Sequence, residues 1–262
     1  MNITLRNVTG GGSRLFKLSL AFTLAEVLIT LGIIGVVAAM TIPTLLSNVQ
    51  RKRLQTQFKK TYAEVNVAAR TFFAEEDMSV HDFDGDAYGS NTVGGGTRSD
   101  LVLQRFMSYF KGQTRTSEYI WRIYDANHKI TQKNLNGKTT TSYPCDESSV
   151  ILDITGRIWA MDDTSTYSGT SYGPKICVDI NGVDSPNRLG YDRFVFVFTE
   201  ANSVVPYTGT TWNNLNENQT AENVIKKYCD YNESSIPAFS CAYFALKDKS
   251  PNGGSYWKNF LK

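Results

Sequence analysis

The longest apolar run of the chain lies near its amino terminus. Between Leu18 and Pro43 the sequence has no Lys, Arg, Asp, His, Asn or Gln, and its single charged residue is Glu26. A helix of about 20 apolar residues can cross the hydrocarbon core of a bilayer. Residues 22–42 are therefore predicted to form a membrane-spanning helix.

Beyond Pro43 the apolar positions recur at helical spacing. Together with the apolar run, this stripe predicts a nearly continuous helix from about Phe22 to Glu75. Proline lacks an amide donor, so a kink or local break is expected at Pro43. The first half would lie in lipid or in a filament core, and the second would pack on a globular domain. Steps of three or four residues separate the members of the stripe, which are Leu54, Phe58, Tyr62, Val65, Ala69 and Phe72.

The pattern changes after this helix. Residues 77–99 are polar and rich in Gly, which predicts a loop. Residues 100–110 have the spacing of a short helix, with Ser99 or Asp100 as its cap. A single long helix followed by five strands predicts an α+β fold, with an antiparallel sheet packed against the helix. The runs rich in β-branched and aromatic residues that predict these strands are 119–124, 150–154, 157–161, 176–180 and 193–198.

Composition and charge exclude some functions. The 262 residues include 27 Lys and Arg and 25 Asp and Glu, so nothing indicates a strongly basic surface for nucleic acid. The two histidines, His81 and His128, lie in polar contexts, and the chain has no zinc-protease, nucleophile-elbow, P-loop or dinucleotide motif. We therefore expect that the protein is not an enzyme, that both histidines are solvated or structural, and that nucleic acid is not a partner.

Glu26 is the most informative charged residue. A carboxylate at the centre of a membrane span costs ~2.5–3.5 kcal/mol, so it is expected only where it has a partner or a function. The apolar run offers no cation. Cleavage just before Phe22 would create an α-amino group four residues away, about one helical turn. An amine from a neighbouring subunit could serve equally.

These residues carry a resemblance to a known family. The basic leader that ends Lys17-Leu-Ser-Leu-Ala21, followed by Phe22-Thr-Leu-Ala-Glu26, resembles the cleavage and methylation signal of type IV pilins and type II secretion pseudopilins. In that family a prepilin peptidase cuts before a Phe, which is then N-methylated. Glu26 and Pro43 match the family's glutamate and its frequent proline, whereas Ala21 stands where Gly is usual. The resemblance covers about the first 60 residues.

The resemblance implies a structural subunit and a division of the chain. The subunit would be a pilin or pseudopilin of a type II secretion or type IV pilus-like filament, and its length favours a minor one. Glu26 would pair with the amine of Phe22 of the adjacent subunit. The implied parts are a prepilin leader (1–21), a transmembrane and filament-core helix (22–43), an amphipathic helix (44–76) and a disulfide-bonded α+β globular domain (77–262).

The same resemblance implies partners and a location. The partners would be the prepilin peptidase and methylase and other pilin or pseudopilin subunits. The subunit would cross the bacterial inner membrane once, with its carboxy-terminal domain outside the cytoplasm, before it enters a periplasmic or surface filament.

Two alternatives explain the apolar run without a filament. An uncut helix would be a plain single-span anchor of an extracytoplasmic domain. Cleavage after Val37-Ala38-Ala39, before Met40, would be ordinary signal-peptide processing and would release a soluble secreted binding domain. Neither alternative gives Glu26 a function.

The distribution of basic residues conflicts with the implied orientation. Counting Lys and Arg on the two sides of the span would place the carboxy-terminal side in the cytoplasm. The cysteines instead favour an oxidising compartment on that side. The basic residues are Arg6, Arg14 and Lys17 before the span and Arg51, Lys52, Arg53, Lys59 and Lys60 after it.

Four cysteines follow the apolar run, at positions 145, 177, 229 and 241. Their even number and the absence of CxxC spacing predict two disulfides, for which three pairings are possible. The pilin resemblance favours Cys229–Cys241, a short loop near the carboxyl end that is common in pilins. The expected partner bond is Cys145–Cys177, which would bracket the middle of the sheet.

The segment 179–193 combines turn dipeptides with oxygen-bearing side chains. One interpretation is a hydrogen-bonded turn. The other is a calcium site, because hard cations prefer oxygen ligands. The segment is also similar to a hairpin of secretion-associated pilin-like proteins, some of which bind calcium, and no other cofactor is indicated. The candidate ligands are Asp179, Asn181, Asp184 and Asp192.

Overall fold

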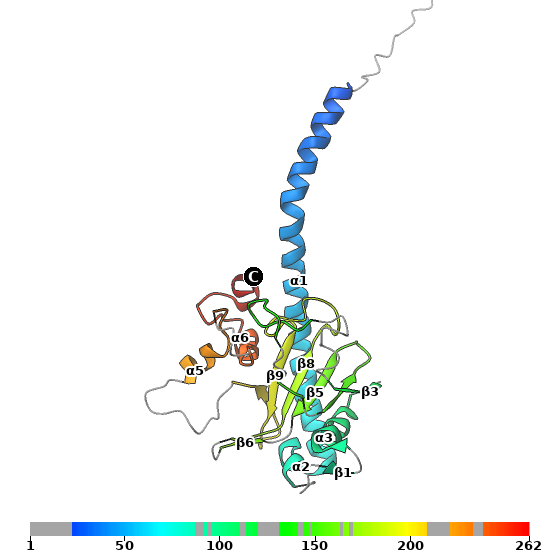
Figure 1. Cartoon of the computed structure of the whole chain (residues 1–262), viewed down its shortest axis with the longest axis vertical. Helices are drawn as coiled ribbons and strands as arrows, with labels where there is room; N and C mark the ends of the chain where they lie inside the picture. The colour runs from blue at the N-terminus through cyan, green and yellow to red at the C-terminus, as the bar shows by residue number, and fades with distance from the viewer. Residues whose placement is uncertain are drawn as a thin grey trace, which may run out of the picture. The chain divides into compact units, whose positions relative to one another are not determined.

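The structure is a computed structural model of the chain (Figure 1). The fold is α+β, with a long amino-terminal helix and a carboxy-terminal antiparallel sheet. The chain divides into two compact units, Met1–Ser47 and Asn48–Lys262. The structure describes residues 23–86, 92–93, 96–110, 114–119, 131–140, 144–146, 148–162, 165–167, 170–208, 221–232 and 238–261.

Helix α1 (Leu24–Glu76) runs through Pro43 without interruption. Of the kink or local break expected at Pro43, the local break is therefore absent. Proline removes one N–H donor, but the turns on either side keep their own hydrogen bonds. The hydroxyl of Thr41, just before the proline, donates to the carbonyl of Val37 at 2.9 Å, which adds a side-chain contact to this part of the helix.

The second half of α1 packs on one face of the sheet, as the spacing predicted. Phe58 lies at the centre, with its ring 4.5 Å from Phe194 and 5.6 Å from Trp257. Tyr62 is half-buried and donates its hydroxyl to the carbonyl of Val204 at 3.1 Å. The buried residues of α1 are Leu54, Phe58, Thr61, Val65, Ala68, Ala69 and Phe72.

The main sheet has six antiparallel strands in the order β10-β9-β8-β5-β4-β3 (Figure 1). Four strands lie within two residues of their predicted positions. The first strand of this sheet along the chain covers 114–119, five residues earlier than expected, and 120–124 lie outside the described residues. The strands are β3 (Thr114–Tyr119), β4 (Ser149–Leu152), β5 (Ile158–Asp162), β8 (Lys175–Asp179), β9 (Arg193–Phe198) and β10 (Val204–Pro206).

Both faces of the central strands are buried. Trp159 pairs with Val178 across β5 and β8, and both side chains join the core formed with α1. Their neighbours Ala160 and Cys177 point to the opposite face and join a smaller cluster. Successive strand residues alternate between faces, so two cores explain why every residue of β5 is buried.

Smaller elements surround this frame. Helix α2 (Val80–Asp86) lies inside the segment predicted to be a loop, which corrects that prediction. Ser79 caps it by accepting from the amide of Asp82 at 3.0 Å, and Val80 is buried. The other small elements are β1 (Thr92–Val93), β2 (Gly96–Thr97), α3 (Arg98–Met107), β6 (Ser165–Tyr167), β7 (Thr170–Tyr172), α5 (Ala221–Lys227), α6 (Cys241–Lys247) and the π-helical turn η2 (Tyr256–Phe260).

Helix α3 begins before its predicted caps. Ser99 and Asp100 lie within the helix rather than at its N-cap. The carboxylate of Asp100 instead accepts from the amide of Ser149 at 2.7 Å and also from its hydroxyl. Asp100 therefore fixes the start of β4 against α3, a long-range contact that local spacing does not reveal.

Candidate functional site

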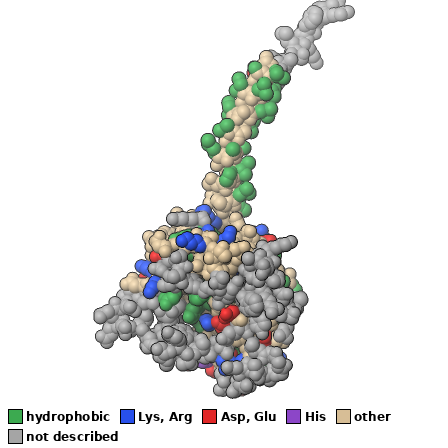
Figure 2. Space-filling model, viewed as in Figure 1, with side chains coloured by type: hydrophobic (Ala, Val, Ile, Leu, Met, Phe, Trp, Pro, Cys, Tyr) green, Lys and Arg blue, Asp and Glu red, His purple; other side chains and the backbone are tan. Residues whose placement is uncertain are grey.

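The first half of α1 exposes an unusually apolar surface, coloured green in Figure 2. By length and composition α1 could cross a membrane, and it is the one helix among the described residues that could. Soluble proteins rarely expose large contiguous apolar patches, and such a patch is typical of a surface that contacts a membrane or another protein. The large exposed side chains are Leu24, Val27, Leu28, Ile29, Leu31, Ile33, Ile34, Val36, Val37, Met40, Ile42, Leu45 and Leu46.

Glu26 is held at the start of α1 by Thr23. Its Oε2 accepts from the Thr23 amide and from the Thr23 hydroxyl, both at 2.8 Å. In return, the amide of Glu26 donates to Thr23 Oγ1 at 3.2 Å. This reciprocal arrangement is a capping box, and its signal in the sequence is the Thr-x-x-Glu spacing, a local pattern that hydrophobic periodicity does not reveal.

The capping box bears on the predicted role of Glu26. It satisfies two donors with Oε2 and does not itself use Oε1. A further donor, such as a neighbouring amine, can therefore be added without disrupting the box. Ala21 and Phe22, the predicted processing residues, lie outside the described residues, so pairing of Glu26 with the Phe22 amine stays a prediction.

A second candidate site is the loop between β8 and β9. Asp192 is fully buried there, and its Oδ2 accepts from the Asn187 amide at 2.8 Å. Its Oδ1 accepts from the Arg188 amide at 2.7 Å. Burial raises the pKa of Asp192 to about 6, against the lowering effect of these hydrogen bonds and of the Arg193 charge. The carboxylate thus closes the loop on itself.

The other predicted calcium ligands also bond within the protein. Asp179 lies 3.8 Å from the Arg193 guanidinium and accepts from the Asn181 amide at 3.3 Å. The Asn181 side-chain NH₂ donates to the carbonyls of Asp184 and Ser185, each at 3.1 Å. These bonds describe a hydrogen-bonded turn, and Asp184 is exposed at its edge.

Two oxygens of this loop are available to a further ligand. Oδ1 of Asn181 and Oδ1 of Asn187 are buried without a hydrogen-bond partner among the described residues. In the same described part of the chain, no cluster of three or more His, Cys, Asp or Glu side chains could hold a metal ion. A cation here would therefore depend on amide oxygens and on displacing bonds that Asp179 or Asp192 already make.

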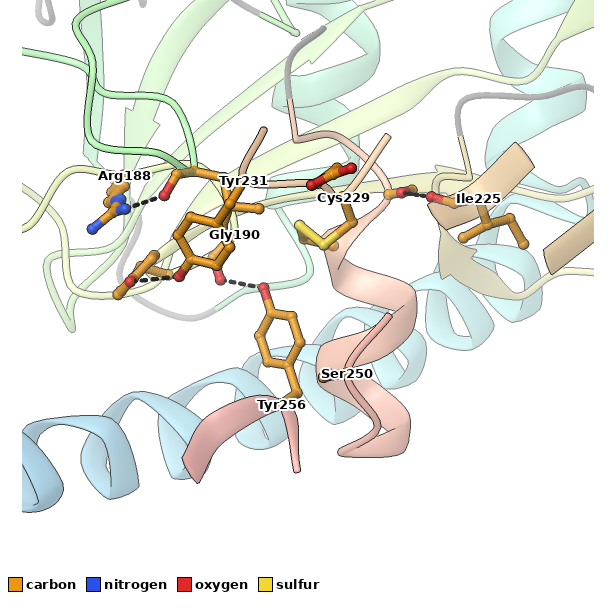
Figure 3. Close-up of a disulfide and its surroundings, with 12 residues drawn as sticks. Arg188, Gly190, Ile225, Cys229, Tyr231, Ser250 and Tyr256 are labelled. Atoms are coloured by element: carbon orange, nitrogen blue, oxygen red, sulfur yellow. Dashed lines mark hydrogen bonds between the residues drawn. A yellow bond between two sulfur atoms is a disulfide. The ribbon is translucent and has the colours of Figure 1, made fainter. Parts of the chain in front are cut away.

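Two disulfides are present, as predicted, and they join Cys145 to Cys177 and Cys229 to Cys241. Cys229 follows α5, and Cys241 begins α6. Figure 3 shows the Tyr256 hydroxyl directed at the carbonyl of Gly190, to which it donates. Gly190 has φ +81°, and a Cβ there would lie 3.0 Å from the Cys241 sulfur. Glycine thus permits the β8–β9 loop to dock on the disulfide.

Of the two histidines, the structure describes His81 alone. His81 lies in α2, where its Nδ1 is 3.2 Å from the carboxylate of its neighbour Asp82. His128 lies outside the described residues. The absence of enzymatic activity stays a prediction.

Comparisons of the chain with protein-family models, with curated proteins and with solved structures find no match. A functional proposal therefore depends on the features of the chain itself: its amino-terminal apolar segment and its globular domain with two buried clusters.

Proposed function

We propose that this protein is a pilin-like structural subunit, made as a membrane-inserted precursor, cut before Phe22 and assembled into a type II secretion or type IV pilus-like filament. The observation that carries this function is the exposed apolar half of α1, whose single charged residue, Glu26, lies in its first turn. The same helix continues into the domain and builds its core. One helix thus supplies both a surface that must be covered by apolar neighbours and an anchor for the displayed domain.

In this proposal the neighbours are lipid before assembly and the same helices of other subunits afterwards. A peptidase and methylase would process the chain at Ala21 and Phe22, and the domain would lie outside the cytoplasm. The two disulfides support that compartment, because disulfides persist in oxidising environments.

The mass and amino-terminal sequence of the mature protein from its native membrane test this proposal. We expect a chain that begins at Phe22 and carries one added methyl group on its amine. A start at Met40 would mean a secreted binding domain, and an intact Met1 would mean a plain membrane anchor. Either result would overturn the filament proposal.

The secreted-domain alternative is favoured by one observation. Every buried hydrophobic residue that the structure describes comes from Leu54 onward. A cut before Met40 would therefore leave the core intact.

We also propose that the β8–β9 loop binds calcium, with the amide oxygens of Asn181 and Asn187 among the ligands. Their burial without a partner supports this site. Titration calorimetry of the full chain in detergent should give heat on calcium addition, and the double variant Asn181→Ala/Asn187→Ala should not. No heat from the unmodified chain would refute the site.

A further inference from the structure

Basic side chains surround α1 immediately after its exposed apolar surface ends. Val49 is exposed, and Arg51, Lys52 and Arg53 follow within four residues. The first buried residue of the helix, Leu54, comes directly after them. Consecutive helical residues are about 100° apart, so these three side chains cover more than half of the helix circumference before the domain begins to cover it.

The carboxy-terminal turn η2 adds a fourth cation to this group. The guanidinium of Arg51 donates to the carbonyl of Lys258 at 3.2 Å, which places η2 beside this turn of α1. Lys258 is exposed, whereas its neighbour Trp257 is buried against Phe58. The burial of Trp257 thus fixes Lys258 at the surface next to Arg51. In Figure 2, blue Lys and Arg side chains gather at the end of the globular unit where α1 enters it.

An acidic group of the same region, Asp248, accepts several hydrogen bonds. Asp248 accepts from the Ser255 hydroxyl at 2.7 Å and from the Trp257 amide at 3.2 Å. The side-chain amide of Gln55 also donates to it, at 3.4 Å. Asp248 therefore holds the turn that presents Lys258, and among the described residues no ion pair joins it to Arg51, Lys52 or Arg53.

We propose that Arg51, Lys52, Arg53 and Lys258, the basic collar, bind the phosphate groups of anionic phospholipids on the membrane surface from which the domain projects. This inference rests on the membrane-inserted precursor of the proposed function. The occupant follows from the order of residues: the continuous exposed apolar surface ends at Leu46, and five helical residues, a rise of about 8 Å, separate Leu46 from Arg51. Positive charge that close to the end of a membrane span meets the headgroup layer.

The basic collar also explains the conflicting charge distribution in the sequence. Basic residues after the span would normally indicate a cytoplasmic location. In this inference they instead hold the base of the domain at the lipid surface until the subunit leaves the membrane.

Lysine footprinting of the full chain in lipid nanodiscs tests the basic collar. The chain is acetylated in discs of phosphatidylcholine alone and in discs with one third phosphatidylglycerol. Mass spectrometry then measures the acetylation rate of each lysine. A basic residue near an anionic surface gains about 1 kcal/mol, a factor of about five. We expect phosphatidylglycerol to slow acetylation of Lys52 and Lys258 about fivefold and high salt to restore it.

The chain offers matched controls for this experiment. Lys227, an exposed lysine of α5, should react at the same rate in both bilayers. Arg51→Gln/Arg53→Gln changes residues that precede the buried core, and it should reduce the protection of Lys258 at least twofold.

Three results would overturn the inference. They are equal reactivity of Lys52 and Lys258 in both bilayers, equal slowing of the control residue Lys227, and equal protection by soluble glycerol phosphate in phosphatidylcholine discs. Flotation of the discs separates this failure from that of the proposed function. A chain that does not float with the discs refutes the membrane span itself, whereas a floating chain that ignores headgroup charge refutes the basic collar alone.

Discussion

At the scale of single residues, Glu26 combines a local and a proposed long-range role. The capping box with Thr23 explains how the carboxylate is held at the start of α1. It does not explain why a carboxylate rather than an apolar residue lies there, because a threonine alone can cap a helix. An additional partner, the proposed neighbouring amine, would supply that reason.

Replacing Glu26 separates the two roles. We expect Glu26→Leu to insert into the membrane normally but to lose most filament assembly or Phe22 methylation, since it removes the partner of the amine. Thr23→Ala, the matched control, removes only the cap, which is worth about 1 kcal/mol, and should assemble far better. Mass spectrometry of the methylated fraction and sedimentation of sheared filaments measure both effects. Normal incorporation of Glu26→Leu would contradict the proposed pairing.

Asp192 should make stability depend on pH. Burial raises its folded-state pKa to about 6, above the usual value of about 3.9. The folded state therefore holds this proton more tightly, so its contribution to stability is present below about pH 4 and is lost as pH rises through 6. Two pKa units correspond to about 3 kcal/mol as an upper limit.

Urea unfolding between pH 4 and pH 7 measures this effect as a difference between variants. In Asp192→Asn the free energy of unfolding should no longer depend on pH in this range. Asp184→Asn, which replaces an exposed carboxylate of the same loop, should keep the pH dependence. Parallel pH profiles for the unmodified protein and Asp192→Asn would show that this pKa is not raised.

At the scale of elements, the second half of α1 is the main support of the sheet. Phe58 contacts rings from both β9 and η2, so truncating it should leave a cavity between three elements. We expect Phe58→Ala to lower the free energy of unfolding by about 3–5 kcal/mol. Phe73→Ala, on the same helix but 39% exposed, should change it far less. Denaturant titration in detergent measures the free energy of unfolding of both variants. Similar losses in the two variants would mean that the apolar stripe from Leu54 to Phe72 is not the packing face of α1.

This stripe was predictable because it repeats. Six apolar residues from Leu54 to Phe72 follow one helical period, and each contacts the core as expected. Helices α2, α6 and η2 span only five to seven residues, too few to show a period. Their positions depend on tertiary contacts such as the burial of Trp257, which local sequence does not encode.

The candidate sites were likewise predictable only where their residues lie close together in the sequence. The capping box of Thr23 and Glu26 was readable, since both residues lie within one turn. The docking of Gly190 on Cys241 was not, because the two residues are 51 positions apart and meet only through the folded sheet and the disulfide. The turn dipeptides around Asp179 predicted a tight loop, but its closure by buried Asp192 required the structure.

At the scale of the whole molecule, the two units have opposite surface requirements. The described part of Met1–Ser47 presents apolar side chains and contributes no buried hydrophobic residue. Asn48–Lys262 contains both cores and both disulfides. The division follows from α1, which changes from an all-apolar surface to an amphipathic one along its length.

A fragment of residues 48–262 should therefore fold by itself. Since every described buried hydrophobic residue begins at Leu54, removing the first 47 residues deletes no core contact. We expect the fragment to be soluble without detergent and to unfold in one cooperative transition, with a midpoint within a few degrees of that of the full chain in detergent. Differential scanning calorimetry and near-ultraviolet circular dichroism measure this. A fragment starting at Lys59 is the matched control: it loses Leu54 and Phe58 and should unfold at a clearly lower temperature. If the 48–262 fragment lacks a cooperative transition, the apolar segment is part of the folding unit, and its exposed surface cannot be reserved for lipid or for neighbouring subunits.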